Sequence, residues 1–389
     1  MNIFVVAEQS SQWEDLHRAA SALVKAFLRL GHKSWLVTGV YHDGAPAVDV
    51  GIVEKSESGY VEVGGGDPSG VPTIRVLSLK SLVPPGGVVF RNFSRVLNDL
   101  ADRYDVDVVI TVGSFWNGPE EAARWASVRR SLLEAGEALR RVSLVYVPFY
   151  MARGALSMPV GTVSRAMWTS LSLPTVLRHV DIVVVCCDSE AQEMRRFKPR
   201  GLLIESRCWL DVEMAEAIDR ASPAAEGAVV YVGPLEEEKN VRGLARLGEA
   251  LSKHGVRVVA VGRGAGVKLK GVEIVEAGGA GEVASYIKGA LAGVDLSYYE
   301  PAGLRALEFL YAGVPVAVSP GSRAYWYISN GVDGVHLENP DDVRGAARWV
   351  VELLKRPELR EEMGRRARSK AGGLSILNLA QLLVNKVGG

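Results

Sequence analysis

Residues 295–321, DLSYYEPAGLRALEFLYAGVPVAVSPG, decide how this chain is interpreted. Two glutamates, Glu300 and Glu308, lie on either side of a Pro-Ala-Gly segment, and short apolar runs flank the whole stretch. Pro301 disfavours helical backbone at the residue before it, whereas the residues after Gly303 are strong helix formers. We therefore predict a strand, then a loop that carries Glu300, and then a helix that begins near Gly303 and carries Glu308.

The predicted helix start is a candidate anion site. The first N–H groups of a helix lack intrahelical partners and carry a partial positive charge, and a glycine there lets an anion approach the backbone. A phosphate would suit the Gly303 and Leu304 amides, while the carboxylates of Glu300 and Glu308 would accept hydrogen bonds from sugar hydroxyls. The alternative is that both glutamates are solvated residues that interact favourably with the helix dipole.

Short β-branched runs alternate with segments of helical length along the chain. Before residue 200 the runs are NIFVVA, SWLVT, VDVVITVG, VSLVYVPF and VDIVVVCCDS, and after residue 225 they are AVVYVG, VRVVAVG, VEIVEA, VDLSYY and VPVAVS. Such alternation predicts an α/β protein in which parallel sheets are covered by helices on both faces.

The length of 389 residues suits two domains of about 150 to 200 residues each. Pro223 and the small residues around it indicate a linker near 205–225. We expect an N-terminal Rossmann-like domain over residues 1–210 and a C-terminal one over 225–373, facing each other across a cleft. The last helix, 374–389, follows a Gly-Gly break and is expected to complete the first domain.

The stretch that opened this section carries a resemblance. Its pattern E-P-x-G-L-x-x-L-E, at 300–308, followed by x-x-G-x-P-V-x-x-S, ending at Ser319, resembles the signature of retaining, nucleotide-sugar-dependent GT-B glycosyltransferases of the family-4 group, the glycosyl transferases group 1. The resemblance implies a GT-B fold, with two doubly wound parallel-sheet domains. It also implies transfer of a sugar from a nucleoside diphosphate sugar to an acceptor.

Two further segments extend this resemblance. YVGPLEEEKN, at 231–240, is similar to the first strand and phosphate loop of the family's second domain, with Lys239-Asn240 matching a lysine-asparagine pair. YISNGVDGVHLENPDDV, at 327–343, is similar to the loop before the closing helices. The resemblance therefore runs from about Ala228 to Ala371, and before residue 225 it depends on the order of elements.

The resemblance implies a role for each matching residue. The donor diphosphate would lie on Gly303 and Leu304, and Glu308 would hold the ribose hydroxyls. Glu300 would contact the transferred sugar, and Lys239 would stabilise the negative charge on the departing diphosphate. Glu300 and Lys239 are thus the candidate catalytic residues.

The first phosphate loop departs from the family pattern. Pro234 stands where the family usually has an arginine, so either Lys239 acts alone or another cation substitutes. Gly233 and the Gly262-Arg263 pair of VAVGRGAG are further candidates for donor binding, with a plain turn as the alternative for the second loop. A dinucleotide fingerprint is disfavoured there because a predicted strand, not a helix, follows the glycines.

Two loops of the N-terminal half are candidates for the acceptor side, because each follows the carboxyl end of a predicted strand. A helix cap with a hydrophobic staple explains the first loop equally well. That loop also lacks the pair of glycines that the family typically carries. The candidate acceptor residues are Ser10, Ser11, Gln12, Trp13, Ser114 and Asn117.

Charge and composition limit the partners. Forty-five basic residues balance forty-five acidic ones, which argues against nucleic acid. Three cysteines, two of them adjacent, fit a reducing compartment, and we expect a cytoplasmic protein. No cofactor or metal is expected: no DxD pair is prominent where the donor would bind, and Asp341-Asp342 is interpreted as a helix cap.

The segment 138–180 has an unusual charge composition, because it holds five arginines and no acidic residue. Arginines mixed with Trp and Met suit peripheral contact with an anionic membrane or a lipid-linked acceptor. The alternative, which we favour, is a buried strand and a core helix with incidental arginines.

Two other functions remain open at this point. A GT-B nucleotide-sugar epimerase would process one substrate at the same place. A non-catalytic nucleotide-sugar or glycan-binding protein is made credible by Pro234 and by the glycine-free first loop. The base, the sugar, the acceptor, the linkage and the oligomeric state are not determined by the sequence.

Overall fold

The chain divides into two compact units in a computed structural model, and each unit has its own sheet and core. Of the described residues, those within 1–151, 171–207 and 376–388 form unit 1, and those within 208–375 form unit 2. The structure describes residues 1–11, 15–43, 45–63, 67–80, 88–113, 117–137, 140–151, 171–264 and 267–388.

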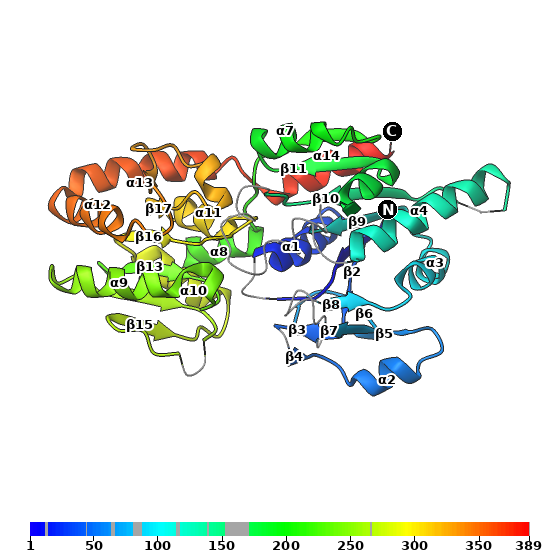
Figure 1. The fold of residues 1–389 in the computed structure, drawn as a ribbon, viewed down its shortest axis with the longest axis horizontal. Coiled ribbons are helices and arrows are strands. Elements are labelled where there is room, and N and C mark those ends of the chain that lie inside the picture. Colours follow the sequence, from blue (N-terminus) through cyan, green and yellow to red (C-terminus); the bar gives the residue numbers. More distant parts are fainter. Residues whose placement is uncertain are drawn as a thin grey trace. The chain divides into compact units, whose positions relative to one another are not determined.

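Unit 1 is built on an eight-stranded sheet of order β12-β11-β10-β9-β1-β2-β6-β5, which is parallel except where β5 joins β6 (Figure 1). Two short hairpins, β3-β4 and β7-β8, follow β2 and β6. The strands are β1 (Asn2–Ala7), β2 (Lys33–Gly39), β3 (Tyr41–His42), β4 (Ala45–Pro46), β5 (Tyr60–Val63), β6 (Thr73–Val76), β7 (Ser78–Lys80), β8 (Val88–Phe90), β9 (Val108–Val112), β10 (Ser143–Val147), β11 (Ile182–Val185) and β12 (Leu202–Glu205).

Helices cover both faces of this sheet. Phe4 and Val6 of β1 belong to a core cluster with residues of α3, α4 and α7, whereas Ile3 and Val5, equally buried, point to the face on which α1 packs against β1. The C-terminal helix α14 packs against α1. The helices of unit 1 for which full bounds are described are α1 (Asp15–Arg29), α2 (Val50–Lys55), α3 (Phe93–Arg103), α4 (Gly118–Glu134), α7 (Asp188–Arg196) and α14 (Ile376–Gly388), and residues 171–179 are helical as well.

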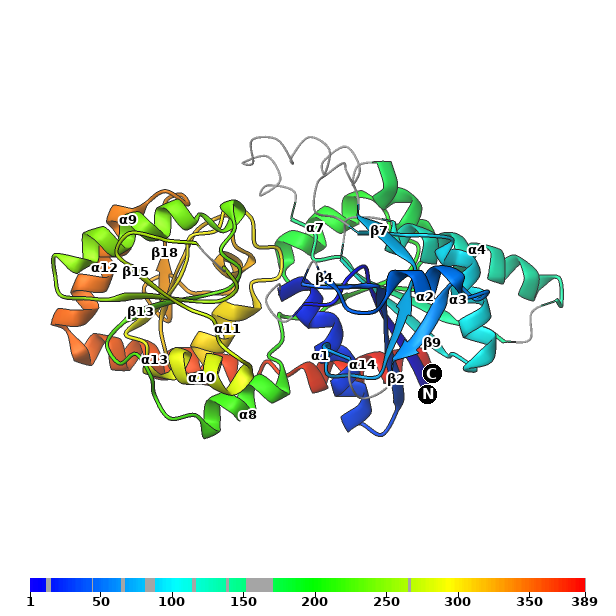
Figure 2. The same cartoon turned by 90° about the horizontal axis from the view of Figure 1, so that it is seen from below.

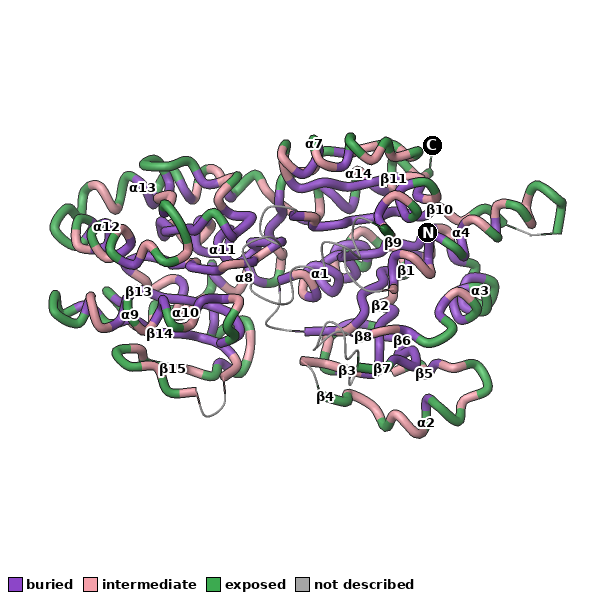
Figure 3. Tube along the Cα trace, viewed as in Figure 1, coloured by how far each residue is buried: buried purple, intermediate pink, exposed green. Residues whose placement is uncertain are grey.

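Unit 2 contains a six-stranded sheet of order β15-β14-β13-β16-β17-β18 in which every described pair is parallel. Its strands are β13 (Val229–Val232), β14 (Val258–Val261), β15 (Val272–Val275), β16 (Ala292–Asp295), β17 (Val316–Val318) and β18 (Gly334–His336). The inner strands are apolar except for Asp295 at the end of β16, as expected for strands covered by helices on both faces. Figure 3 shows that these strands are largely buried.

The helices of unit 2 pack in pairs: α9 with α12, α8 with α10, and α11 with α13 (Figure 2). They are α8 (Val212–Arg220), α9 (Val241–Ser252), α10 (Ala280–Gly289), α11 (Leu304–Tyr311), α12 (Val343–Lys355) and α13 (Pro357–Ala371), with the 3-10 helices η1 (Glu237–Lys239) and η2 (Arg323–Trp326). No helix in the described part of the chain is both long enough and apolar enough to span a bilayer.

Both sheets are doubly wound, as predicted. In unit 1 the chain moves outward from β1 through β2 and β6 and then returns to β9 beside β1. In unit 2 it moves from β13 to β14 and β15 and returns to β16 beside β13. Open α/β sheets bind ligands at the carboxyl ends of the strands where the order reverses, so each unit has one preferred place for a ligand.

Candidate functional site

The two predicted catalytic residues meet at the reversal point of unit 2. Lys239 ends η1 after β13, and Glu300 lies in the loop after β16. The Lys239 Nζ atom lies 2.8 Å from Glu300 Oε2 and donates a second hydrogen bond, of 3.0 Å, to the Tyr299 carbonyl oxygen. The two side chains are only 8% and 13% exposed, so the pair is held out of water.

Each partner keeps the other ionised. Burial by itself would lower the pKa of Lys239, but the carboxylates of Glu300 and Glu238 hold it well above its usual value. Burial would likewise raise the pKa of Glu300, yet Lys239 and the Gly303 and Ala302 amides bring it below its usual value. A charged ammonium and a charged carboxylate therefore stand together at neutral pH.

The loop before α11 is fixed by the other carboxylate oxygen of Glu300. Its Oε1 atom accepts hydrogen bonds from the Ala302 and Gly303 amides, at 3.1 Å and 3.2 Å. Gly303 has φ +65°, and a Cβ placed on it would lie 2.8 Å from the Ala324 nitrogen, so only glycine fits without strain. α11 then begins at Leu304, within one residue of the predicted start.

Glu308 lies inside α11 and is 1% exposed. Its Oε2 atom accepts a hydrogen bond of 2.9 Å from Arg305 Nη1, one helical turn earlier. A second buried arginine, Arg323, donates from Nε to the Pro301 carbonyl oxygen at 3.1 Å. The sequence analysis did not single out either arginine, although the spacing of Arg305 and Glu308 is that of an i, i+3 ion pair.

The second loop predicted to bind the donor packs directly on the first. A Cβ placed on Gly262 would lie 1.8 Å from the Gly233 carbonyl oxygen, and the Leu235 amide donates to the Arg263 carbonyl oxygen at 3.1 Å. The Arg263 side chain is 40% exposed and lies 3.9 Å from a Glu236 carboxylate oxygen. Gly233, Gly262 and Arg263 are thus brought together, beside the strand end that leads to Lys239.

The predicted acceptor residues Ser10 and Ser11 are buried and already hydrogen-bonded. Ser10 Oγ lies 2.8 Å from His42 Nδ1 and accepts a hydrogen bond of 3.0 Å from Arg75 Nη2, while Ser11 Oγ bonds to the Asp43 carboxylate. Arg75 is itself fully buried and makes a bidentate pair with Asp67 at 2.9 Å. These two serines therefore tie the loop after β1 to the loop after β2.

Asn117, another predicted acceptor residue, is hydrogen-bonded to a neighbouring strand. Both polar atoms of the Asn117 side chain bond to the backbone of Phe90, at 2.9 Å and 2.8 Å, which anchors the start of α4 to β8. Gln12, Trp13 and Ser114 lie outside the described residues.

Asp342 caps α12 as predicted, because its side chain accepts a hydrogen bond from the Gly345 amide at 2.8 Å. Asp341 instead bonds to Arg246 and to the Tyr298 hydroxyl. Among the described residues no three His, Cys, Asp or Glu side chains are grouped as a metal site would require.

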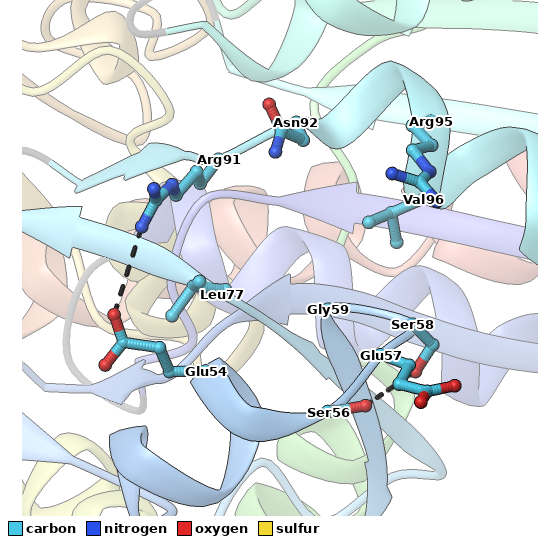
Figure 4. A pocket seen from close by; sticks show the side chains of 10 residues that line it. All are labelled: Glu54, Ser56, Glu57, Ser58, Gly59, Leu77, Arg91, Asn92, Arg95 and Val96. Atoms are coloured by element: carbon cyan, nitrogen blue, oxygen red, sulfur yellow. Dashed lines mark hydrogen bonds and ion pairs between the residues drawn. The ribbon is translucent and has the colours of Figure 1, made fainter.

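A cavity of about 320 Å³ lies elsewhere in unit 1, between the turn after α2 and the start of α3 (Figure 4). Arg91 and Arg95 line it together with Glu54 and Glu57, and Arg91 lies 3.9 Å from Glu54. None of the residues predicted from the sequence borders this cavity, and its opposed charges give it no net preference for an anion.

Comparison with known proteins agrees with this geometry. Residues 216–370 match the family model of the glycosyl transferases group 1, which confirms the predicted resemblance over this part of the chain. No curated protein sequence matches the chain significantly.

Solved structures that are similar over the whole chain include a sucrose-phosphate synthase, a UDP-glucose complex and a glycosyltransferase. Sucrose-phosphate synthase from Thermosynechococcus elongatus is 16% identical with a TM-score of 0.69, covering 100% of this chain and 99% of that one. HepE from Anabaena in complex with UDP-glucose is 12% identical with a TM-score of 0.66 and the same coverage. WaaG, a glycosyltransferase of lipopolysaccharide biosynthesis, is 14% identical with a TM-score of 0.63, covering 100% of both chains. The predicted GT-B fold is therefore confirmed.

Proposed function

We propose that this protein moves a sugar from a nucleoside diphosphate sugar to a hydroxyl of a glycan or lipid-linked acceptor, with retention of anomeric configuration and without a metal ion. The observation that carries the proposal is the buried pair of Lys239 and Glu300 beside the start of α11. A cation and a carboxylate at a helix start suit a substrate that joins a diphosphate to a polyhydroxylated sugar. The binding of UDP-glucose by the similar protein HepE supports this choice of donor.

Lys239 is assigned to the departing diphosphate. Cleavage of the anomeric C–O bond leaves negative charge on the phosphate oxygen, and a cation positioned in advance in a water-poor site stabilises that charge. A lysine ammonium has three N–H donors, and two of them bond to Glu300 and to the Tyr299 carbonyl. We assign the third donor to the phosphate.

Glu300 and Glu308 are assigned to hydroxyl groups on either side of that phosphate. Glu300 uses three of the roughly four acceptor positions of a carboxylate on Lys239, Ala302 and Gly303, which leaves one for the transferred sugar. Glu308 is assigned to the ribose hydroxyls, with its carboxylate oriented by Arg305. The Gly303 and Leu304 backbone would receive the diphosphate between them.

Substitution of Lys239 and of Glu308 tests their two assigned roles separately. After a thermal-shift screen of UDP, GDP, ADP and their common sugars has identified the donor, we expect Lys239→Ala to lower turnover by about a hundredfold or more with little change in nucleotide affinity. Glu308→Ala is expected to weaken donor and nucleotide alike, by about tenfold or more, because hydrogen bonds to a charged acceptor are lost. Isothermal titration and a sugar-transfer assay measure both quantities.

Lys270→Ala is the matched control, because Lys270 is an exposed lysine of the same unit that pairs with Glu249. Unchanged turnover in Lys239→Ala, or an equal loss in the control, would contradict the assigned role. A product in which the sugar remains on the nucleotide would indicate an epimerase. Nucleotide binding without hydrolysis or transfer, for any donor and acceptor tried, would indicate a binding protein.

The acceptor and the cellular location belong to the same proposal. A cytoplasmic enzyme with peripheral membrane contact through 138–180 would reach a lipid-linked acceptor. Of that segment the structure describes 140–151 and 171–180, where β10 is buried and Arg140 pairs with Asp107. Membrane contact through this segment stays a prediction.

A further inference from the structure

The reversal point of unit 1 carries a carboxyl group that the sequence analysis did not select. Glu8 is the first residue after β1, next to the return strand β9. This is the position in unit 1 that Gly233, after β13, occupies in unit 2. By the general rule for open α/β sheets, a ligand of unit 1 is expected at this place.

Glu8 is buried, and one of its two carboxyl oxygens lacks a hydrogen-bond partner among the described residues. The residue is 2% exposed, and within the described part of the chain its Oε1 atom has no hydrogen-bond partner. Buried carboxyl oxygens in native proteins nearly always have a partner, because an unpaired one costs free energy. A ligand that donates a hydrogen bond to Oε1 would remove this cost.

Two glycines leave space for this carboxyl group. A Cβ placed on Gly118, the first residue of α4, would lie 2.8 Å from Glu8 Oε1, and one placed on Gly113, after β9, would lie 3.8 Å from Oε2. Any larger residue at 118 would have to displace the carboxyl group. The backbone on both sides of the reversal point thus approaches Glu8 closely.

A second buried carboxylate, Glu190, has the hydrogen-bond partners that a purely structural role requires. Glu190 of α7 is completely buried, and its two oxygens accept hydrogen bonds from the Tyr150 and Cys186 amides, at 2.5 Å and 2.7 Å. Each oxygen of Glu190 has a backbone donor that holds two elements together. Glu8 Oε1 has no such donor in the described residues, so a purely structural role does not account for it.

The charged and titratable groups that face Glu8 come from three elements. Burial raises the pKa of Glu8 to about 7; the Glu8 and Gly118 amides and His17 of α1 oppose this, while Glu120 of α4 adds to it. The buried hydroxyl of Tyr146, on β10, also interacts with Glu8. Glu8 therefore titrates near neutral pH, and its ionised form is the stronger acceptor for a hydroxyl donor.

We propose that Glu8 Oε1 accepts a hydrogen bond from a hydroxyl group of the acceptor sugar, at the reversal point of unit 1. The inference rests on the proposed glycosyltransferase function and assigns the acceptor as a polyhydroxylated compound. One O–H group supplies the donor that Oε1 lacks. A metal ion is a poorer match, because the described residues around Glu8 do not supply three ligating side chains.

The test measures saccharide and nucleotide binding in the same full-length protein. The probes are glucose, galactose, mannose and N-acetylglucosamine, as free sugars and methyl glycosides, with UDP, GDP and ADP titrated separately. For at least one saccharide, we expect Glu8→Gln to weaken binding about tenfold or more, which corresponds to losing a charged acceptor. Wild-type binding is expected to tighten from pH 6 to pH 8, as Glu8 ionises, and that pH dependence is expected to vanish in the variant.

Glu190→Gln is the matched control, because it changes a buried carboxylate of the same unit that has backbone partners. It is expected to lower thermal stability while leaving saccharide affinity and its pH dependence unchanged. Nucleotide affinity is expected to be the same in all three proteins.

The outcomes separate the two proposals. Nucleotide binding combined with no saccharide binding by the wild type, or with unchanged saccharide binding in Glu8→Gln, would overturn the assignment of Glu8 alone. Failure of every nucleotide to bind the wild type would overturn the proposed function. A loss of saccharide binding equal in Glu8→Gln and Glu190→Gln would show that only stability had changed and would also overturn the assignment.

Discussion

The buried ionisable side chains of this protein differ in whether hydrogen-bond and ion-pair partners surround them. Arg75 has Asp67, Ser10 and two backbone carbonyls as partners, and Lys239 has Glu300 and a carbonyl. Glu8 has an oxygen without a partner among the described residues, and burial raises its pKa. The paired charges hold loops in place, whereas the raised pKa of Glu8 links folding to pH in the neutral range.

The pH dependence of stability tests this point. The pKa of Glu8 is about 7 in the folded protein against 4.5 as its ordinary value, so the folded state binds this proton more tightly than the unfolded state. The resulting stabilisation is complete below pH 4.5 and is lost as pH rises through 7. We expect Glu8→Gln to remove this dependence. Between pH 4.5 and pH 8, the free energy of unfolding of the variant is expected to rise relative to that of the wild type by up to about 3 kcal/mol.

Urea unfolding of both proteins at several pH values measures the difference directly. The difference between variant and wild type is the informative quantity, because the other titrating groups are common to both. A difference that stays constant from pH 4.5 to pH 8 would show that Glu8 does not titrate in this range.

At the scale of elements, the predicted donor loops of unit 2 depend on close contact between backbones. Gly262, after β14, lies against the Gly233 carbonyl after β13, and Gly321, after β17, lies against the Ser297 carbonyl at 2.3 Å from where its Cβ would be. The Gly321 carbonyl in turn accepts a hydrogen bond from the Glu300 amide at 2.8 Å. Glycines thus let neighbouring loops set the position of Glu300 and of the first phosphate loop.

Replacement of Gly262 tests the role of these contacts. A Cβ at 1.8 Å from the Gly233 oxygen requires the backbone to move, so we expect Gly262→Ala to destabilise unit 2 by about 1 to 3 kcal/mol and to weaken nucleotide binding. Urea unfolding and calorimetric titration with the nucleotide identified by the screen provide the two readouts.

Gly281→Ala is the control, because Gly281 lies in α10 and a Cβ there would meet no atom within 4 Å. It is expected to leave nucleotide binding unchanged and to raise stability by up to about 1 kcal/mol. Wild-type stability and affinity in Gly262→Ala would mean that the two loops are not coupled.

At the scale of the whole molecule, the chain builds two cores and then returns to the first. α14, the last element, belongs to unit 1 and packs against α1 through its buried face. The buried residues of that face are Ile376, Leu379, Ala380 and Leu383. The final helix thus belongs to the unit that holds Glu8, while the predicted donor residues lie in the other unit.

Truncation after Ser375 tests this division. Removal of three large buried side chains of α14 is expected to destabilise unit 1 by about 5 kcal/mol or more, while unit 2 still binds the nucleotide. Limited proteolysis locates the destabilised unit, and calorimetric titration measures the binding.

Truncation after Asn385 is the control, because the described residues that it removes are not buried. It is expected to behave as wild type. Loss of nucleotide binding in the longer truncation, with unit 1 still resistant to protease, would contradict the assignment of α14.

The sequence by itself determined the features that depend on neighbouring residues. Hydrophobic runs of strand length that alternate with helices define parallel sheets, and Pro301 and Gly303 place the start of α11 between two glutamates. The cap formed by Asp342 is of the same kind. These features follow from backbone preferences and side-chain chemistry within about ten residues, which a sequence displays directly.

Only the tertiary structure decided which side chains meet. Lys239 and Glu300 are 61 residues apart in the chain, and parallel pairing of β13 with β16 brings the loops that carry them to one edge of the sheet. At the corresponding edge of the sheet in unit 1, Ser10 contacts Arg75, which is 65 residues away in the chain. Glu8 Oε1, near that edge, has no hydrogen-bond partner in the described residues. Sequence spacing does not show such contacts, because the order and register of the strands decide which loops become neighbours.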